Sequence, residues 1–193
     1  MHHHPSIRFC PHCGTAGLTF DGKNRFSCDS CGFVLFQNTA TGCGAILELR
    51  DNQAQNDPAG AKSNGDEVHV LLLERGKEPA KGALDFPGGF VDPGESAEEA
   101  LQREIREETG LVATELRYLC SAANQYRYRD VVYSTCDFVF TGSIYDEPVT
   151  LQAGEIASYR LLRPTEIDVE QIAFPSLQSA MRRYLAQREE QHR

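Results

Sequence analysis

The stretch from Gly89 to Leu111 constrains the fold of this chain more than any other part of the sequence. Its second half predicts an amphipathic helix that starts at a capping box formed by Ser96 and Glu99 and ends at Gly110. Apolar residues recur every four positions along this helix, at Ala97, Leu101 and Ile105. One side of the helix must therefore pack against the rest of the protein.

Three acidic residues of the same helix, Glu104, Glu107 and Glu108, fall within an arc of roughly 100°. Glu104 and Glu108 lie close to the apolar stripe, whereas a solvated helix would carry its acids on the opposite side. At about 6 Å and an effective dielectric constant near 20, each like-charge pair costs roughly 3 kcal/mol. Bound divalent cations or protonation would make this cluster tolerable, and oxygen ligands favour Mg²⁺ or Mn²⁺ over zinc.

An acidic magnesium site indicates a phosphorylated substrate. Magnesium typically completes its coordination shell with waters and substrate phosphates, and the formal net charge of −9 means that an anionic substrate needs cations as a bridge. The expected reaction is hydrolysis, in which an acidified water attacks phosphorus.

The segment resembles the Nudix signature G-x5-E-x7-R-E-U-x-E-E-x-G-U, in which U is aliphatic. The matching positions are Gly89, Glu95, Arg103, Glu104, Ile105, Glu107, Glu108, Gly110 and Leu111. This resemblance implies an α/β/α sandwich with a mixed sheet, in which a loop-helix-loop segment holds Mg²⁺ and cleaves a diphosphate linked to another group.

The resemblance also implies roles for individual residues. Glu107 and Glu108 would be metal ligands, Glu104 a third ligand or the general base, and the backbone carbonyl of Gly88 a further ligand. Glu95 and Arg103 would form an ion pair that holds the loop against the helix. A carboxylate from a later loop often joins the site in this family, and the candidate here is Glu155, just before a predicted strand.

Four of the seven cysteines lie in two close pairs near the N-terminus, Cys10 with Cys13 and Cys28 with Cys31. The C-x2-C spacing directs both sulfurs of a pair at one centre and is typical of a structural zinc site rather than a disulfide framework. Residues 18–20 and 25–27 between the pairs predict a short hairpin. Residues 1–36 are therefore expected to form a small zinc ribbon whose metal supplies its folding free energy.

The remaining residues, 37–193, are expected to form one α/β domain with a mixed sheet. Strands are predicted at residues 41–50, 67–75, 115–120, 131–140 and 157–162, a loop at 79–94 and a second helix at 176–188. Residues 51–66 are polar and without periodicity, so they predict a long surface excursion inside this domain.

A zinc ribbon before a Nudix segment resembles the arrangement of the NADH pyrophosphatases. That subfamily carries the motif S-Q-P-W-P-F-P-x-S after the signature, whereas this chain has residues 121–129 at that place and no tryptophan. NADH, ADP-ribose and damaged nucleoside triphosphates therefore stay open as substrates. Tyr126, Arg127 and Tyr128 could stack on a base and contact phosphate, or could pack a sheet face.

Three functional hypotheses follow. The preferred one is a Mg²⁺-dependent hydrolase that cleaves a nucleotide-containing small molecule and releases a nucleoside monophosphate. The second is a non-catalytic nucleotide sensor or nucleic-acid adaptor that uses the ribbon. The third is an isomerase of prenyl diphosphates, which the complete signature disfavours.

The charge pattern bears on partners and location. The ribbon carries Arg8, Lys23 and Arg25 against Asp21 and Asp29, which is too little positive charge for a phosphate-backbone footprint, so nucleic acid is not an expected partner. Because the sequence lacks a long apolar run and an apolar leader, we expect a cytoplasmic protein without membrane contact. The resemblance leaves a homodimer possible.

Overall fold

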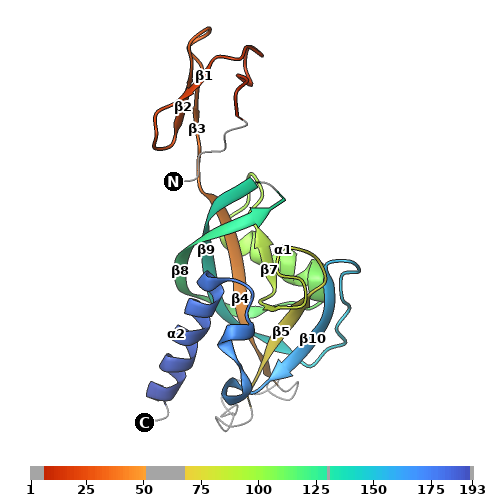
Figure 1. The fold of residues 1–193 in the computed structure, drawn as a ribbon. Helices are drawn as coiled ribbons and strands as arrows, with labels where there is room; N and C mark the ends of the chain where they lie inside the picture. Colours follow the sequence, from red (N-terminus) through yellow and green to blue (C-terminus); the bar gives the residue numbers. More distant parts are fainter. Residues whose placement is uncertain (1–6, 51–67, 130, 192–193) are drawn as a thin grey trace.

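The computed structural model describes residues 7–50, 68–129 and 131–191. The excursion predicted at residues 51–66 lies outside the described residues. Two sheets and two α-helices make up the described chain, and Figure 1 shows the smaller sheet projecting from one end of the larger body. No described helix combines the length and the apolar character that a membrane crossing requires.

The smaller sheet has three antiparallel strands in the order β1-β2-β3. Their bounds are β1 Leu18–Phe20, β2 Arg25–Cys28 and β3 Val34–Phe36. The predicted hairpin is confirmed as β1 and β2, while the third strand was not predicted because three residues are too short for a periodic signal. We call residues 7–36 the ribbon.

The larger sheet is mixed and has the path β10-β5-β4-β9-β8, with β6 paired to β5 and β7 paired to β4. Only β4 and β9 run parallel, from Ala40 beside Thr135 to Arg50 beside Tyr145. The bounds are β4 Ala40–Arg50, β5 His69–Arg75, β6 Leu84–Asp85, β7 Gly88–Phe90, β8 Thr114–Tyr128, β9 Val131–Tyr145 and β10 Ile156–Leu162. Two 3-10 turns, Pro164–Glu166 and Val169–Gln171, follow β10.

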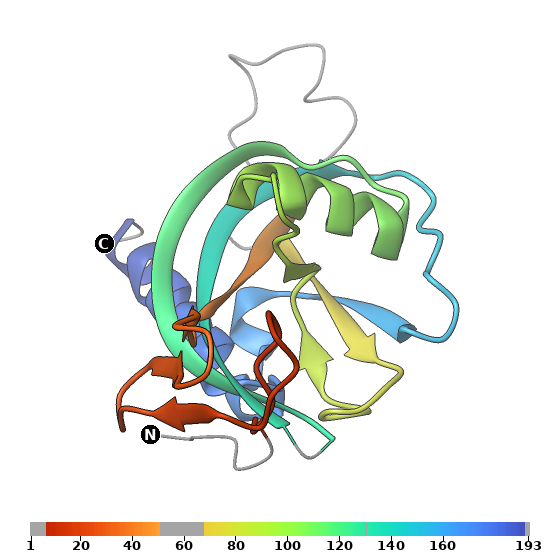
Figure 2. The same ribbon diagram turned by 90° about the horizontal axis from the view of Figure 1, so that it is seen from above.

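The two helices cover opposite faces of this sheet, as Figure 2 shows from above. Helix α1, Ala97–Thr109, packs Leu101 and Ile105 against Leu47 and Leu71. Helix α2, Pro175–Gln191, packs Met181 and other apolar residues against the opposite face of the sheet. Alternate residues of the central strands thus serve two separate cores, and the predicted α/β/α sandwich is confirmed.

The ends of α1 form as predicted. The Ser96 side chain accepts from the Glu99 N–H, the Glu99 carboxylate accepts from the Ser96 N–H, and Gly110 adopts a left-handed conformation with φ of 75°. This reciprocal cap satisfies two backbone donors that the first turn would leave without partners. The cap therefore sets the residue at which α1 begins, and with it the direction of every glutamate on the helix.

Strands β4 and β5 pair only through residues 47–49 and 69–71. Beyond that point the two strands diverge, because β7 pairs with β4 at Gly42–Gly44 and β6 pairs with β5 at Leu73 and Glu74. The loop predicted at residues 79–94 therefore contains two short strands, which Pro87 separates. The divergence opens a path between the two faces of the sheet.

The prediction for β8 was too short. The strand was expected at residues 115–120 but continues to Tyr128, with register irregularities near Tyr118 and Cys120. Small and polar residues from Ser121 to Gln125 give no β-propensity signal, and pairing with β9 supplies the missing stabilisation. The extended hairpin brings Asn124 and Tyr126 to the cavity described below.

Replacing Leu101 with alanine should lower the free energy of unfolding by about 2–5 kcal/mol, because the side chain is fully buried between α1 and the sheet. Urea denaturation measures this loss. The control Val112→Ala, at a position that is 50% exposed, should change stability by less than about 1 kcal/mol. Equal losses in the two variants would contradict the described packing of α1.

Candidate active site

Helix α1 presents its acidic residues at the point where β4 and β5 diverge. The Glu108 side chain is buried, with 7% of the residue exposed, and its Oε2 accepts a hydrogen bond of 2.9 Å from the Gly88 N–H. Glu104 is mostly buried, while half of the Glu107 side chain is exposed. Two of the three predicted carboxylates, Glu104 and Glu108, therefore line a cavity, whereas Glu107 is not among the residues that line it.

The close approach of α1 to β7 depends on two glycines. A Cβ atom at Gly88, where φ is 151°, would lie 2.1 Å from the Cys43 carbonyl oxygen. A Cβ atom at Gly89 would lie 2.4 Å from Glu104 Oε1. Because any side chain at these positions would collide with backbone or with the carboxylate, only glycine allows the carboxylates to lie directly on the strand.

Arg103 connects the loop before α1 to the acidic face. Its guanidinium binds Glu95 through two hydrogen bonds of 2.9 Å, so the ion pair that the family resemblance implies is present. The same guanidinium donates to Glu104 Oε1 at 2.8 Å and lies 3.4 Å from Glu107 Oε2. The bidentate contact lowers the pKa of Glu95.

Arg103 changes the charge balance that the sequence predicted for the acidic face of α1. From the sequence, divalent cations or protonation were expected to balance the charge of the three carboxylates. The structure shows that a neighbouring arginine already balances part of the charge of Glu104 and Glu107. Glu108 is the carboxylate that lacks such a cation among the described residues, and its one hydrogen bond comes from a backbone N–H.

Burial raises the pKa of Glu108 to about 8, and the charges of Asp85, Glu104 and Glu155 add to this effect. Burial also raises the pKa of Glu104, against the opposing effect of Arg103. Removing these carboxylates from water disfavours their charged forms, so a cation bound among them would restore the ionised state. The donors offered, carboxylate oxygens, suit Mg²⁺ or Mn²⁺.

Glu155 lies where the sequence placed it, in the loop before β10. Its carboxylate pairs with Lys77 Nζ at 2.5 Å and acts on both Glu104 and Glu108 through its charge. It lines the same cavity as those two residues, together with Gly88. The structure therefore brings the later-loop acid to the acidic face of α1.

The cavity has a volume of about 280 Å³. Its lining combines the carboxylates of Glu104, Glu108 and Glu155 with an aromatic wall formed by the rings of Phe90, Tyr126 and Phe174. Tyr126 is thus part of the wall, whereas Arg127 and the exposed Tyr128 are not.

Several polar residues of the cavity were not predicted from the sequence. Arg75 and Asp85 form a mostly buried ion pair of 2.5 Å, and Asn124, Thr135 and Asp137 lie along β8 and β9. A polar residue inside an apolar strand was the available signal for Thr135 and Asp137. Nothing in the sequence indicated that these strands reach the cavity.

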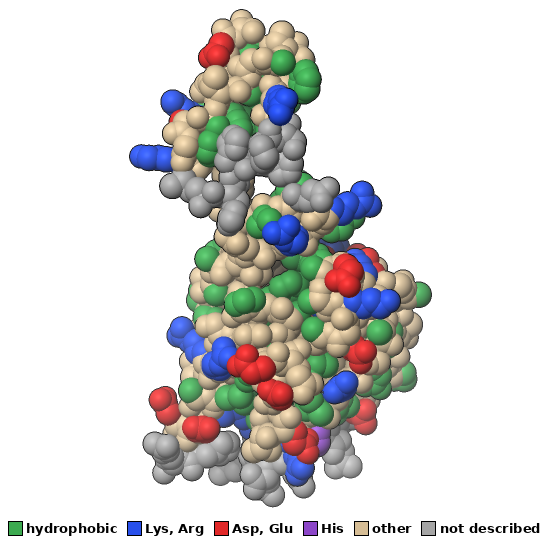
Figure 3. Space-filling view, in the orientation of Figure 1, with side chains coloured by type: hydrophobic (Ala, Val, Ile, Leu, Met, Phe, Trp, Pro, Cys, Tyr) green, Lys and Arg blue, Asp and Glu red, His purple; other side chains and the backbone are tan. Residues whose placement is uncertain are grey.

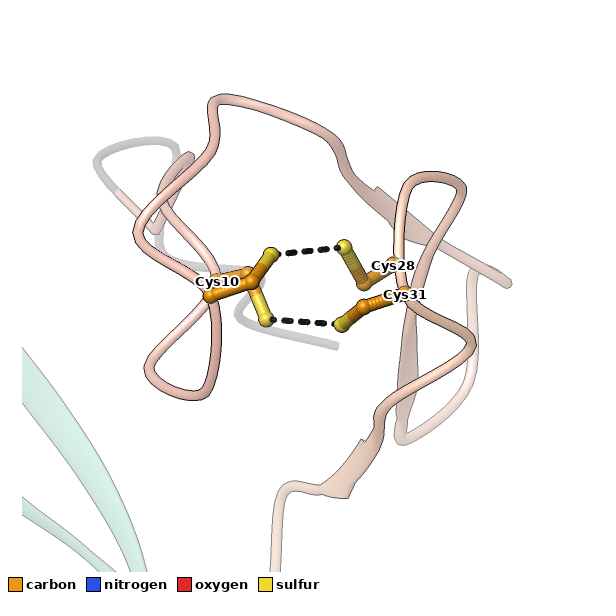
Figure 4. Close-up of side chains that lie close together, drawn as sticks. Cys10, Cys28 and Cys31 are labelled. Atoms are coloured by element: carbon orange, nitrogen blue, oxygen red, sulfur yellow. Dashed lines mark hydrogen bonds between the residues drawn. The ribbon is translucent and has the colours of Figure 1, made fainter.

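The four N-terminal cysteines converge in the ribbon, as Figure 4 shows, from two loops that face each other. Cys10 Sγ lies 3.7 Å from Cys31 Sγ, and Cys13 Sγ lies 3.7 Å from Cys28 Sγ. Four sulfurs at about 2.3 Å from a tetrahedral zinc are roughly 3.8 Å apart, so the observed spacing fits that ion. Backbone N–H groups of Cys31 and Ser30 lower the pKa of Cys28 to about 6, which favours the ligating thiolate.

The cysteine cluster is a more compact metal-ligand set than the glutamates. Across residues 7–50, 68–129 and 131–191, it is the one group of three or more possible ligands whose atoms all lie within 4.8 Å of one another. The carboxylates of α1 are spread more widely, as Arg103 lies between Glu104 and Glu107.

The family described as the NUDIX domain matches residues 60–187, which is most of the chain and includes all of α1. The chain belongs to the Nudix family. A crystal structure of a NUDIX hydrolase from Nitrosomonas europaea has a TM-score of 0.68 to this chain at 24% identity, and the match covers 95% of this chain and 93% of that one. This similarity extends beyond the family match and shows a shared fold.

Two curated proteins are similar in sequence. The NAD-capped RNA hydrolase NudC of Deinococcus radiodurans is 28% identical over 143 residues, which cover 74% of this chain and 46% of that protein. The ADP-ribose pyrophosphatase of Methanocaldococcus jannaschii is 56% identical over 43 residues, 22% of this chain and 25% of that protein. The chain therefore spans less than half the length of either curated relative.

The raised pKa of Glu108 predicts a pH effect on stability without added Mg²⁺. The folded state keeps a proton that the unfolded state loses above a pKa of about 4.5, so this residue makes the folded state less stable as pH rises from about 4.5 to 8. Glu108→Gln should flatten that decline in urea denaturation measured between pH 5 and 8. Glu98→Gln, on the exposed side of α1, should leave the slope unchanged, and equal slopes in all three proteins would contradict the burial argument.

Proposed function

We propose that this chain hydrolyses the diphosphate bond of a nucleotide-containing small molecule and releases a nucleoside monophosphate. One observation carries the proposal: α1 places the carboxylates of Glu104 and Glu108 in the wall of a cavity that three aromatic rings also line. Such a cavity suits a ligand that has a polyanion at one end and a planar ring at the other.

Mg²⁺ or Mn²⁺ would be held by Glu104, Glu107 and Glu108, with the Gly88 carbonyl and Glu155 as further ligands. When bound, the cation would neutralise the diphosphate and acidify the attacking water. Family membership supports this assignment, and so does Glu108, which is buried without a cationic side chain among the described residues.

The chain's own residues would position the substrate and handle the proton. Arg103 holds Glu104 in place and, through Glu95, fixes the loop that enters α1. Glu104 or a loop carboxylate such as Glu155 would accept the proton of the attacking water. Water adds to one phosphorus, the bridging P–O bond breaks, and the second phosphate leaves with its own group.

The substrate classes that we favour are ADP-ribose and NADH or related dinucleotides. The two curated relatives are named for ADP-ribose and for NAD-capped RNA. Both of these compounds contain an adenosine diphosphate unit. Few basic residues lie on the ribbon, and in Figure 3 acidic and basic side chains are interspersed on the visible face. These features favour a small-molecule substrate over a long nucleic acid.

Glu107→Gln and Glu108→Gln should each lower kcat on ADP-ribose or NADH by about 10²-fold or more, because each removes a ligand charge from the diphosphate end. The assay follows release of AMP with Mg²⁺ present. Glu98→Gln, on the exposed side of the same helix, is the matched control and should retain activity. Full activity in both site variants, or no turnover across a wide nucleotide panel, would refute the hydrolase.

For the ribbon we propose a structural zinc ion bound by Cys10, Cys13, Cys28 and Cys31. Four thiolates leave no open position for water, so this metal would stabilise the fold rather than catalyse a reaction. Elemental analysis of protein purified without chelator should give one zinc per chain. Cys28→Ser should lose that zinc, whereas Cys120→Ser, outside the ribbon, should keep it.

A further inference from the structure

The cavity extends through the opening between β4 and β5 to the α2 face of the sheet, where a second set of polar residues lies. Thr135 and Asp137 are two positions apart on β9 and share one face with Val139, which belongs to the core under α2. Asn124 pairs with Thr135 across the strands, and all three polar residues line the cavity. We call Asn124, Thr135 and Asp137 the inner polar set.

Only one oxygen of the Asp137 carboxylate, Oδ2, accepts hydrogen bonds from described residues. Its Oδ2 accepts hydrogen bonds from Ser176 Oγ at 2.6 Å and from Asn124 Nδ2 at 3.1 Å. Its Oδ1 lies over Gly42, where a Cβ atom would be only 2.7 Å away, and no described residue donates to it. The carboxylate is therefore fixed in orientation and keeps one oxygen to accept from a ligand.

Thr135 carries a second unused group. The residue is 2% exposed, and among the described residues its hydroxyl is the one buried side-chain polar atom that lacks a hydrogen-bond partner. A buried hydroxyl without a partner is costly, so such a group at a cavity wall points to a ligand that completes it. Thr135 can donate where Asp137 can only accept.

The aromatic wall lies beside the inner polar set. Tyr126 contacts Phe90 edge-on with ring centroids 5.3 Å apart and contacts Phe174 at 5.8 Å. The guanidinium of Arg75 covers the Phe174 ring at 5.0 Å. These contacts hold the rings in place, and a planar ligand can pack against them.

We propose that the inner polar set binds the base of the substrate and selects adenine. Asp137 accepts from the exocyclic amino group, and Thr135 donates to the ring nitrogen N1, which is bonded to the same carbon. Bound in the same pose, guanine would place its carbonyl O6 against the Asp137 carboxylate, and two acceptors that face each other cannot form a hydrogen bond. This inference rests on the proposed function, because it takes the part of the cavity lined by Glu104 and Glu108 as the diphosphate site.

Binding of nucleoside monophosphates to the full chain tests the proposal without turnover. Isothermal titration calorimetry should show that AMP binds about tenfold more tightly than purine riboside monophosphate, which lacks only the amino group. Asp137→Asn should reduce that ratio to less than threefold. Ratios within twofold for the unaltered protein, an unchanged ratio in Asp137→Asn, or no AMP binding at millimolar concentration would each overturn the proposal.

Thr135→Val provides a second, nearly isosteric test that does not depend on the stability of the Asp137 variant. It should weaken AMP binding severalfold and leave the binding of 1-deaza-AMP, which lacks the ring nitrogen, unchanged. Thr114→Val is the matched control, since the Thr114 hydroxyl bonds the Ser143 carbonyl at the other end of β8, and it should bind both ligands like the unaltered protein. Equal AMP affinity in Thr135→Val and Thr114→Val would remove Thr135 from the site.

The same titrations on Glu108→Gln separate this proposal from the hydrolase assignment. That variant should lose hydrolysis and keep the preference for AMP. Loss of hydrolysis without any preference for AMP rejects only the adenine subsite. Preference for AMP with undiminished hydrolysis rejects only the assigned role of Glu108.

Discussion

The contact between α1 and β7 is the constraint on which the rest of the site depends. Gly88 and Gly89 leave the first two positions of this strand without side chains, so that Glu108 can bond the Gly88 N–H and Glu104 can lie over Gly89. The helix is positioned for this contact by its capping box and by the two hydrogen bonds between Arg103 and Glu95. Burial of the Glu104 and Glu108 carboxylates and their raised pKa values follow from this close packing of α1 on β7.

The cavity beside this contact depends on the divergence of β4 and β5. An uninterrupted sheet would separate the acidic face of α1 from the α2 side. Because β7 and β6 replace the missing pairing, one opening connects Glu104 and Glu108 with Asp137 and the aromatic wall. The fold can thus hold the charged and the planar parts of one ligand with residues from opposite faces of a single sheet.

The parts of the fold that depend on local spacing could be predicted from the sequence. The capping box, the apolar stripe of α1 and the paired cysteines each act within a few residues, and all three are found in the structure. The inner polar set could not be predicted, because Asn124 and Asp137 meet only through the register of β8 and β9, and Ser176 comes from α2. The contacts of Arg103 with Glu104 and Glu107 were also not predicted. A sequence signature shows which residues are present, but not how many carboxylates one guanidinium contacts.

Gly88 and Glu108 are needed for different physical reasons. At Gly88 the Cys43 carbonyl leaves no room for a side chain, so the architecture itself excludes every other amino acid. Glu108 is a buried acid that weakens the fold when ionised, and an amide or an apolar residue there would be the better structural choice. In a randomised library screened for solubility alone, glycine should persist at the first position while the second drifts away from glutamate. Such a screen would sort residues kept by geometry from residues kept by chemistry.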